Sequence, residues 1–329
     1  MKKKILIYSF NDQLGDGLQK VAFIQELKKV FDNSYIVYST SNKTSLRSYL
    51  KPLIAGYIDE FIEYNGIRSS IIDLIFKKNA KLSNIKFDLI IDLQKVVLRT
   101  LNLKKIPHEI FISPAANFFF SNIKNYKKNL MKNIYIEQFY FNILSLITGN
   151  NYKRIPEMKI PNKLHFHYAI NTDTSKNIGI APGAGDKKKT WPFESYLEIG
   201  KYLQSRNYNV YFFLGPDEKN LLESCLNNGF LCPEWKNGEK ISDDILSIMN
   251  LAKRMLCLLC NDSGTSWMFE FACIKTFKIF GVTNEKKFAR PEYCTPLEIS
   301  KFGNYQLNNF PMEIYKEQLN IFLNKINEN

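Results

Sequence analysis

The 329-residue sequence lacks several features that define common classes of protein. It has only three histidines and no D-x-D pair, so neither a histidine-based metal site nor a carboxylate-held divalent ion is supported. No apolar run approaches the ~20 residues of a membrane span, and the opening MKKKILIYSF turns polar at Asn11 and Asp12 before a signal-peptide core is complete. These absences favour a cytoplasmic protein that holds no metal.

Cysteine is present, but its placement does not suggest disulfides. All six cysteines lie in the second half of the chain, and most stand inside apolar segments. Cys257 and Cys260 form a C-x-x-C pair in MLCLLC, which is typical of a buried strand, where an odd offset directs two side chains to opposite faces. We expect buried, reduced thiols.

Basic residues are in excess, with 45 Lys and Arg against 32 Asp and Glu, and the excess is uneven. Residues 1–165 contain 26 basic and 13 acidic side chains, whereas residues 166–329 contain 19 of each. This asymmetry favours a polyanionic partner for the first half: nucleic acid, acidic lipid headgroups or a phosphorylated glycan. Composition does not choose among the three.

In the first half of the chain, short β-rich runs alternate with helical patterns, as in a parallel sheet covered on both faces. The strands are expected at Lys4–Ser9, Tyr35–Ser39, Glu60–Tyr64, Phe87–Leu93 and Glu109–Ser113. The helices are expected near Gly17–Val30, Ser45–Ile54 and Arg68–Lys78. A stretch with two prolines and no clear periodicity, Asn150–Lys163, is the expected linker.

After the linker the same alternation starts again. The strands are expected at Asn177–Ala181, Asn209–Leu214, Met255–Cys260 and Thr276–Phe280. The helices are expected at Phe193–Arg206, Asp217–Asn227, Ser242–Ala252 and Ser263–Cys273. The sequence therefore predicts an α/β protein of two doubly wound, Rossmann-like domains, residues 1–155 and 156–329, with the carboxyl ends of both sheets facing a central cleft.

The turn after the first strand, N-D-Q-L-G-D-G at residues 11–17, is the first candidate site. It lies at the carboxyl edge of the predicted sheet, where glycines let the backbone approach a ligand and a carboxylate can act as a general base. The alternative is that Asp16 only caps the following helix, since Asp is a preferred N-cap.

Two turns in the second half have the chemistry of anion sites. Residues 181–192, A-P-G-A-G-D-K-K-K-T-W-P, combine a glycine-rich turn with three lysines, which suits a diphosphate; a solvated lysine run is the alternative. Residues 261–265, N-D-S-G-T, open a helix whose free amides attract an anion, although an N-cap by Asp262 or Ser263 also explains them. Both turns follow parallel strands, which favours one shared phosphorylated ligand.

Aromatic and basic residues alternate near the end of the first domain. Phe118, Phe119 and Phe120 are followed by four nearby lysines, Lys124, Lys127, Lys128 and Lys132. This pattern suits an anionic membrane surface or single-stranded nucleic acid. Core aromatic side chains beside a solvated lysine face are the alternative.

Five segments, in their order along the chain, resemble the motifs of glycosyltransferase family 9, the bacterial ADP-heptose:lipopolysaccharide heptosyltransferases and their relatives. They are Gly15-Asp16 after the first strand, FDLIIDLQ at residues 87–94, Lys189-x-Trp191-Pro192, LGPDE at residues 214–218, and NDSG at residues 261–264. The resemblance runs from the first strand to about Pro291.

The resemblance implies a GT-B fold whose N-terminal domain binds an acceptor and whose C-terminal domain binds a nucleotide sugar. It implies an inverting, metal-independent transfer of heptose or a related sugar from a nucleoside diphosphate, such as ADP-heptose, to a lipopolysaccharide core or another surface glycan. It assigns the base to Asp16, the acceptor-side loop to Asp12, Gln13 and Gly15, and the donor site to Gly183, Lys189, Glu218, Asp262, Ser263 and Gly264.

One departure bears on the donor. The family continues D-[ST]-G-x-x-H into an alanine-rich helix, whereas this chain has Trp267 at the histidine position. The accepted donor can therefore differ from ADP-heptose, and a catalytically diverged or inactive GT-B protein is the alternative. An oxidoreductase or epimerase is disfavoured because no G-x-G-x-x-G follows the first strand.

The expected partners follow from the same features. A nucleic-acid module is disfavoured because no recognition motif is present. The expectation is a cytoplasmic enzyme that contacts the inner face of the membrane to reach a lipid-linked or phosphorylated glycan.

Overall fold

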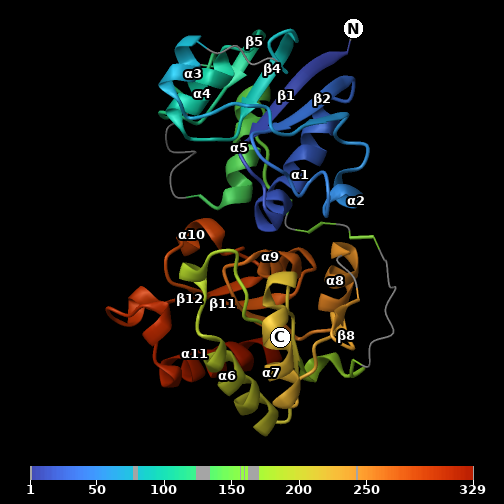
Figure 1. Ribbon diagram of the computed structural model, residues 1–329, viewed down its shortest axis with the longest axis vertical. Helices are drawn as coiled ribbons and strands as arrows, with labels where there is room; N and C mark the ends of the chain where they lie inside the picture. The colour runs from blue at the N-terminus through green and yellow to red at the C-terminus, as the bar shows by residue number, and fades with distance from the viewer. Residues whose placement is uncertain are drawn as a thin grey trace. The chain divides into compact units, whose positions relative to one another are not determined.

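The computed structural model describes residues 2–76, 81–123, 134–155, 157–158, 160–161, 170–241 and 244–328. The chain divides into two compact units, Met1–Ile155 (unit 1) and Pro156–Asn329 (unit 2), each built on a five-stranded parallel sheet with helices on both faces (Figure 1). The predicted class, two doubly wound α/β domains, is confirmed. The roles predicted for the two domains stay predictions.

The sheet of unit 1 has the strand order β3-β2-β1-β4-β5. Its strands are β1 (Lys3–Ser9), β2 (Ser34–Thr40), β3 (Glu60–Ile62), β4 (Phe87–Asp92) and β5 (His108–Ile112). Its helices are α1 (Leu14–Val30), α2 (Lys51–Ile54), α3 (Ile71–Phe76), α4 (Val97–Lys104) and α5 (Ile136–Thr148). Helix α1 packs against α2 and α5, and α3 packs against α4.

The middle strand of this sheet is apolar on both faces, which is why helices cover both. Ile5, Leu6 and Ile7 are fully buried. Leu6 belongs to a core that includes Leu103 of α4, and helices α1 and α5 pack against each other. A continuous apolar run is the signature of such a strand, so the strand could be predicted directly.

The sheet of unit 2 has the strand order β12-β11-β10-β6-β7. Its strands are β6 (Asn177–Ala181), β7 (Asn209–Phe212), β10 (Cys257–Asn261), β11 (Lys275–Phe280) and β12 (Cys294–Glu298), and β8 (Trp235–Lys236) pairs with β9 (Glu239–Lys240) separately. Its α-helices are α6 (Phe193–Ser205), α7 (Leu222–Asn227), α8 (Ile245–Ala252), α9 (Gly264–Phe271), α10 (Glu285–Phe288) and α11 (Met312–Asn327).

Aromatic packing closes one face of the second sheet. Trp191 stacks on Tyr315 of α11, with ring centroids 4.3 Å apart, and Phe277 of β11 meets Tyr315 edge-on at 5.3 Å. Helices α8 and α9 pack against each other. Cys257 and Cys260 are buried in β10 as free thiols, as expected, although Cys273 is exposed.

The first helix begins earlier than its glycines suggest. Helix α1 starts at Leu14, not near Gly17, so Gly15 and Gly17 lie inside it. Gly17 is needed there because a Cβ at this position would collide with Ser45 and Leu50 of the neighbouring loop. Close packing of the Ser45 and Leu50 side chains against the backbone of α1, rather than a turn, explains this glycine.

The aromatic and basic segment is only partly described. Phe118 is buried and Phe120 packs against the core, so two of the three phenylalanines follow the core alternative, while Phe119 is 79% exposed. The four lysines that follow lie outside the described residues, as do Pro156, Lys159, Asn162 and Lys163 of the expected linker. Within the described ranges, no helix has the length and apolar character needed to cross a membrane.

Candidate functional sites at the carboxyl edges of the sheets

In unit 1 the chain leaves β1 toward β2 on one side, while β4 lies on the other side of β1. Such a switch in strand order opens a crevice at the carboxyl edge of a doubly wound sheet, and ligands bind there. The two loops that border this crevice are 10–13 after β1 and 93–96 after β4. The predicted acceptor-side loop therefore lies at the switch point.

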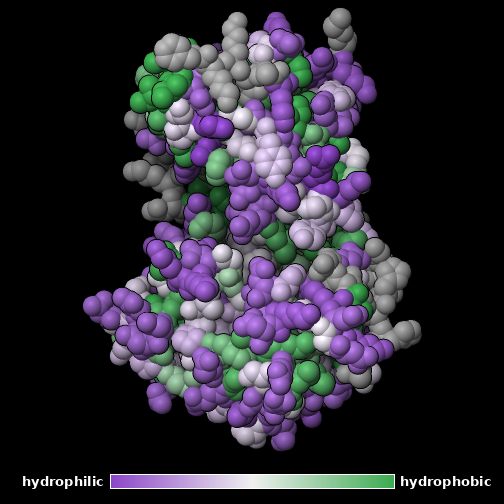
Figure 2. Space-filling view, in the orientation of Figure 1, coloured by the Kyte–Doolittle hydropathy of each residue, from purple (hydrophilic) through white to green (hydrophobic). Residues whose placement is uncertain are grey.

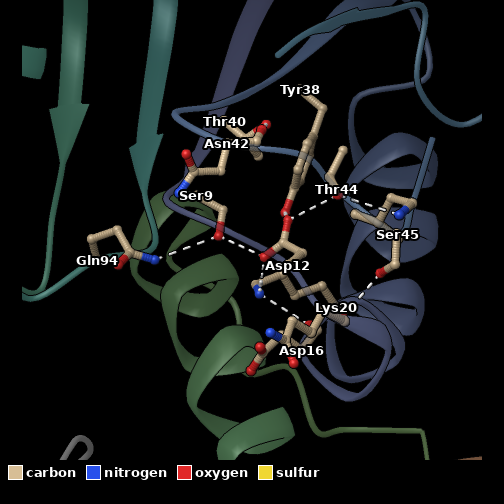
Figure 3. Close-up of polar contacts among 12 residues, drawn as sticks. Ser9, Asp12, Asp16, Lys20, Tyr38, Thr40, Asn42, Thr44, Ser45 and Gln94 are labelled. Carbon is tan, nitrogen blue, oxygen red and sulfur yellow. Dashed lines mark hydrogen bonds and ion pairs between the residues drawn. The ribbon is translucent and has the colours of Figure 1, made fainter. Parts of the chain in front are cut away.

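Asp12 is the centre of a buried polar network at this edge (Figure 3). Its Oδ1 accepts hydrogen bonds from Ser9 Oγ and Lys20 Nζ, both at 2.7 Å. Its Oδ2 accepts from Tyr38 Oη at 2.7 Å and Thr44 Oγ1 at 3.1 Å. The four donors come from β1, α1, β2 and the loop after β2, so the carboxylate joins these four segments.

The charge of Asp12 is stabilised although the group is buried. Burial opposes ionisation, but the ammonium of Lys20 and the hydrogen bonds from Lys20, Tyr38 and Ser9 outweigh it, so the pKa of Asp12 lies below its ordinary value. The pKa of Lys20 is raised for the same reason, because Asp12 offsets the cost of burying its ammonium. The ionised carboxylate of Asp12 accepts four hydrogen bonds and thereby holds the loop in place.

Asp16 lies one helical turn away from this network and is exposed. It is the third residue of α1, and Gln13 is the N-cap, so the interpretation of Asp16 as the N-cap is wrong. A carboxylate in the first turn is still favoured by the helix dipole. The Asp16 carbonyl accepts from Lys20 Nζ at 3.0 Å, so Lys20 fixes the backbone of Asp16 as well as the Asp12 carboxylate.

Arg99 in α4 was missed by sequence reasoning. Its guanidinium lies 3.7 Å from the ring centroid of Phe10, in the loop after β1. Among the described residues, its Nε is buried without a hydrogen-bond partner. Gln94, which donates to Ser9 Oγ at 3.4 Å, joins the loop after β4 to the end of β1. The Asp-Leu-Gln ending of FDLIIDLQ was the available signal, but the stacking on Phe10 is long-range.

Asp92 closes the carboxyl end of β4. It is fully buried, and its Oδ2 accepts from Thr100 Oγ1 at 2.5 Å and Ser113 Oγ at 2.8 Å. Burial raises the pKa of Asp92 to about 6, and the hydrogen bonds oppose that shift only in part. The carboxyl therefore links α4 to the loop after β5 and takes up a proton more readily than an exposed carboxyl does.

This shift gives a pH dependence of stability. An acid whose pKa is raised by folding binds its proton more tightly in the folded state, so stability falls as the pH rises from about 4 through about 6. A shift of about two units corresponds to roughly 3 kcal/mol. In urea titrations at pH 4 and pH 7, we expect Asp92→Asn to remove this part of the loss. The control variant Asp32→Asn, at an exposed site, should lose as much stability between pH 4 and pH 7 as the parent does. An equal change in the free energy of unfolding for all three proteins would contradict the assignment.

In unit 2 the strand order switches between β6 and β10, so the turn after β6 and the turn after β10 border the crevice. Asn261 at the end of β10 joins them. Its Oδ1 accepts from the Trp191 backbone amide and from Tyr196 Oη, both at 3.0 Å, and its Nδ2 donates to the Pro182 carbonyl at 2.7 Å. One buried amide therefore ties both candidate turns together.

The structure brings most of the predicted donor-site residues into two contacts. Lys189 Nζ lies 3.4 Å from Asp262 Oδ2, so the lysine turn and the N-D-S-G turn meet. Glu218, in the 3-10 helix η4 (Pro216–Leu221), lies against Gly183, where a Cβ would collide with its carboxylate. Burial, and then the neighbouring Asp217, raise the pKa of Glu218. Lys189 and Asp262, 73 positions apart in sequence, thus share one edge of the sheet.

Ser263 is the N-cap of α9, which settles the alternative between Asp262 and Ser263. Its Oγ accepts from the Ser266 amide, and the Ser266 side chain reaches back to the Ser263 amide, both at 3.3 Å. The next amides, of Gly264 and Thr265, have no partner within the helix. The cap and an anion-binding role are compatible, because the cap uses other groups.

Trp267, at the position of the family histidine, lies inside the unit. It is 2% exposed, and Lys278 Nζ lies 5.0 Å from its ring centroid. Lys278 forms an ion pair with Glu270 at 2.7 Å, with both side chains fully buried. Arg290, also fully buried, donates to the Glu270 carbonyl at 2.7 Å. A buried charged cluster therefore lies behind the first turns of α9.

This pair predicts non-additive effects on stability. Lys278→Met leaves the Glu270 carboxylate buried without its closest cation, and we expect a loss of about 3–5 kcal/mol in the free energy of unfolding. Adding Glu270→Leu should recover part of that loss, because no uncompensated carboxylate remains. Urea unfolding of the parent, both single variants and the double variant measures the coupling. Additive losses would show that the two charges do not stabilise each other.

Comparison with known proteins agrees with this geometry. The sequence profile of glycosyltransferase family 9 (heptosyltransferase) matches residues 75–298. No curated protein sequence matches the chain significantly. Three solved structures are similar over nearly the whole chain. A family 9 glycosyltransferase from Veillonella parvula has 20% sequence identity and a TM-score of 0.70, and the match covers 99% of this chain and 98% of that one. E. coli heptosyltransferase WaaC with ADP-2-deoxy-2-fluoro heptose has 13% identity and a TM-score of 0.62, with 96% of this chain and 99% of that one covered. E. coli ADP-heptose lps heptosyltransferase II has 16% identity and a TM-score of 0.56, with 98% and 99% covered.

The chain belongs to glycosyltransferase family 9, because the family profile matches about two thirds of it. It is a glycosyltransferase with the GT-B fold, as its motifs predicted. The roles of the individual site residues stay predictions. In the part of the chain that the structure describes, no three His, Cys, Asp or Glu side chains gather as ligands for a metal.

Proposed function

We propose that this glycosyltransferase moves heptose or a related sugar from a nucleoside diphosphate to a hydroxyl of a lipopolysaccharide core or another surface glycan, with inversion and without a metal. The observation that carries the proposal is the contact of Lys189 with Asp262 at the switch point of unit 2. It unites two sequence motifs that each suit a phosphate. The names of the similar structures, with ADP and a fluoro analogue of ADP-heptose, support an ADP-sugar as donor.

The donor phosphates fit the edge of unit 2. The Lys189 ammonium supplies positive charge, and the Gly264 and Thr265 amides at the start of α9 point the helix dipole at an anion. Glu218, held against Gly183, supplies acceptor oxygens that suit ribose hydroxyls. Charge that develops on the leaving diphosphate would be stabilised by the same lysine and amides, which is the work a divalent ion does elsewhere.

The acceptor fits the edge of unit 1. A sugar hydroxyl is a weak nucleophile, so attack on the anomeric carbon gains from a carboxylate that takes its proton as the new bond forms. Asp16, in the first turn of α1 after this loop, is exposed, whereas the buried Asp12 carboxylate accepts four hydrogen bonds. The proton passes to Asp16, and the nucleoside diphosphate departs from the opposite face, so the anomeric configuration inverts.

Anionic groups on the acceptor would explain the cations of unit 1. Residues 1–155 carry 24 basic and 12 acidic side chains. Arg99, stacked on Phe10 beside the loop of Asp12, is placed to receive a phosphate or carboxylate. A lipid-linked acceptor of this kind lies among acidic headgroups, so we include peripheral contact with an anionic membrane in the proposal.

A catalytically inactive relative is the second candidate, and Trp267 favours it. A buried tryptophan cannot offer the donor the polar ring nitrogens of a histidine. Binding of a nucleoside diphosphate without turnover would support this candidate.

The base is tested by Asp16→Asn. The amide cannot accept the proton, so we expect kcat to fall ~10²-fold or more while the fold and ADP binding persist. Glu26→Gln, which changes a carboxylate farther along α1, serves as the matched control and should keep normal turnover. Turnover by Asp16→Asn close to that of the parent would remove Asp16 from the mechanism.

The phosphate contact is tested by Lys189→Ala. We expect weaker binding of ADP as well as of the whole nucleotide sugar, because the diphosphate is the part they share; a charged hydrogen bond of ~1.5–3 kcal/mol corresponds to a roughly 10- to 150-fold loss of affinity. Lys187→Ala, in the same 3-10 turn, is the matched control, since Lys187 is exposed and contacts no candidate residue among the described ones. Calorimetry with equal ADP affinities for the two variants would place the phosphates elsewhere.

A further inference from the structure

Helix α3 exposes its apolar side chains. Ile71, Ile72 and Ile75 are 60%, 71% and 65% exposed. Their spacing of three and four residues puts them on one side of the helix. Figure 2 shows this apolar patch in green at the upper left, over the place that α3 has in Figure 1. Amphipathic helices of a doubly wound domain normally turn this side to the sheet, so the orientation of α3 needs an explanation.

Polar contacts to the backbone hold α3 in this orientation. Ser70 Oγ accepts from the Asp73 amide at 3.2 Å at the start of the helix. Lys105 Nζ donates to the carbonyls of Asp73 and Leu74, both at 3.0 Å. Asn102 Nδ2 donates to the Ser70 carbonyl at 3.1 Å. These bonds fix the backbone against α4 and leave the isoleucine side free to meet a partner.

One cation binds α3 directly, and two others lie in the segments that flank this helix. Lys105 is exposed and binds the helix itself, and Arg68, three residues before Ile71, is exposed too. Lys81, also exposed, donates to the carbonyl of Tyr64 in the loop that leads to α3. Aliphatic side chains flanked by lysine and arginine match a surface that offers hydrocarbon below a layer of negative headgroups.

We propose that Ile71, Ile72 and Ile75 insert into an anionic lipid surface, with Arg68 and Lys105 at the level of the headgroups. This inference deepens the membrane contact in the proposed function and rests on it. It assigns that contact to α3, not to the segment around Phe119. A protein partner fits less well, because the centres of protein interfaces favour aromatic residues and methionine and are poor in lysine.

The two parts of the surface act together. One short apolar face gives weak and reversible attachment, and stable attachment needs a second signal such as a group of cations. Cations within a Debye length of the headgroups supply it. Binding should therefore weaken as salt rises from ~0.05 to ~0.5 M, without vanishing while the isoleucines are present.

The test is co-sedimentation of the full chain with vesicles of phosphatidylglycerol and phosphatidylcholine. We expect the triple variant Ile71→Ser, Ile72→Ser, Ile75→Ser to have a partition coefficient onto these vesicles at least tenfold lower than that of the parent. The matched control removes three aliphatic side chains of similar exposure from unit 2, Leu226→Ser, Leu231→Ser and Ile321→Ser, and should bind as the parent does. Those three residues are 52%, 51% and 57% exposed.

Two results would overturn the proposal. One is equal partition of the triple variant and the parent, including the case in which the parent does not bind these vesicles at all. The other is a triple variant that still binds vesicles but no longer self-associates in sedimentation velocity. That result would show that the isoleucine side of α3 binds a second copy of the chain.

ADP affinity of the same proteins separates this inference from the proposed transfer. If the triple variant loses vesicle binding and its ADP affinity is unchanged, docking through α3 is supported. Failure of the parent to bind ADP, with vesicle binding present, would overturn the donor chemistry and leave the docking surface standing.

Discussion

A polar side chain buried at the carboxyl end of a parallel strand must find its partners inside the protein, because an unsatisfied polar group there costs several kcal/mol. In unit 1 this constraint falls on Asp12, whose carboxylate collects four donors. In unit 2 it falls on Asn261, whose amide binds three groups. The loops at each switch point supply the hydrogen-bond partners of these two side chains, which fixes the path of the backbone there. The candidate site residues lie in or directly next to these loops.

Rigid loops suit the proposed transfer, because a base and phosphate contacts at these positions would have to stay in place as charge develops. Lys20 shows how the fold provides this, since one ammonium binds the Asp12 carboxylate and the Asp16 carbonyl. Asp16 is thus anchored through its backbone while its side chain faces solvent. In unit 2 Ser263 does the same for the start of α9, because its cap fixes the turn without using the amides of Gly264 and Thr265.

Local patterns predicted the elements whose causes are local. The run from Ile5 to Ile7 identified β1, and N-D-S-G predicted the start of α9 within one residue. The start of α1 was mispredicted because Gly17 serves a contact with Ser45, which is distant in sequence. The contact of Lys189 with Asp262 was anticipated only through topology: both turns follow neighbouring strands. The partners of Asp12 come from 3 to 32 residues away, and no spacing rule connects them.

The charge of unit 1 shows why composition alone was ambiguous. Some of its cations serve the fold: Lys20 is buried against Asp12, and Lys28 and Lys104 donate to the carbonyls of Ser34 and Phe120. These lysines contribute to the count but offer no external partner an exposed charge. Other cations are available at the surface near two features: the half-buried Arg99 stacks on Phe10 in the loop after β1, and the exposed Arg68 and Lys105 lie next to α3. In the proposed function, Arg99 would face an anionic group of the acceptor, and Arg68 and Lys105 would face the headgroups of the lipid surface that carries it.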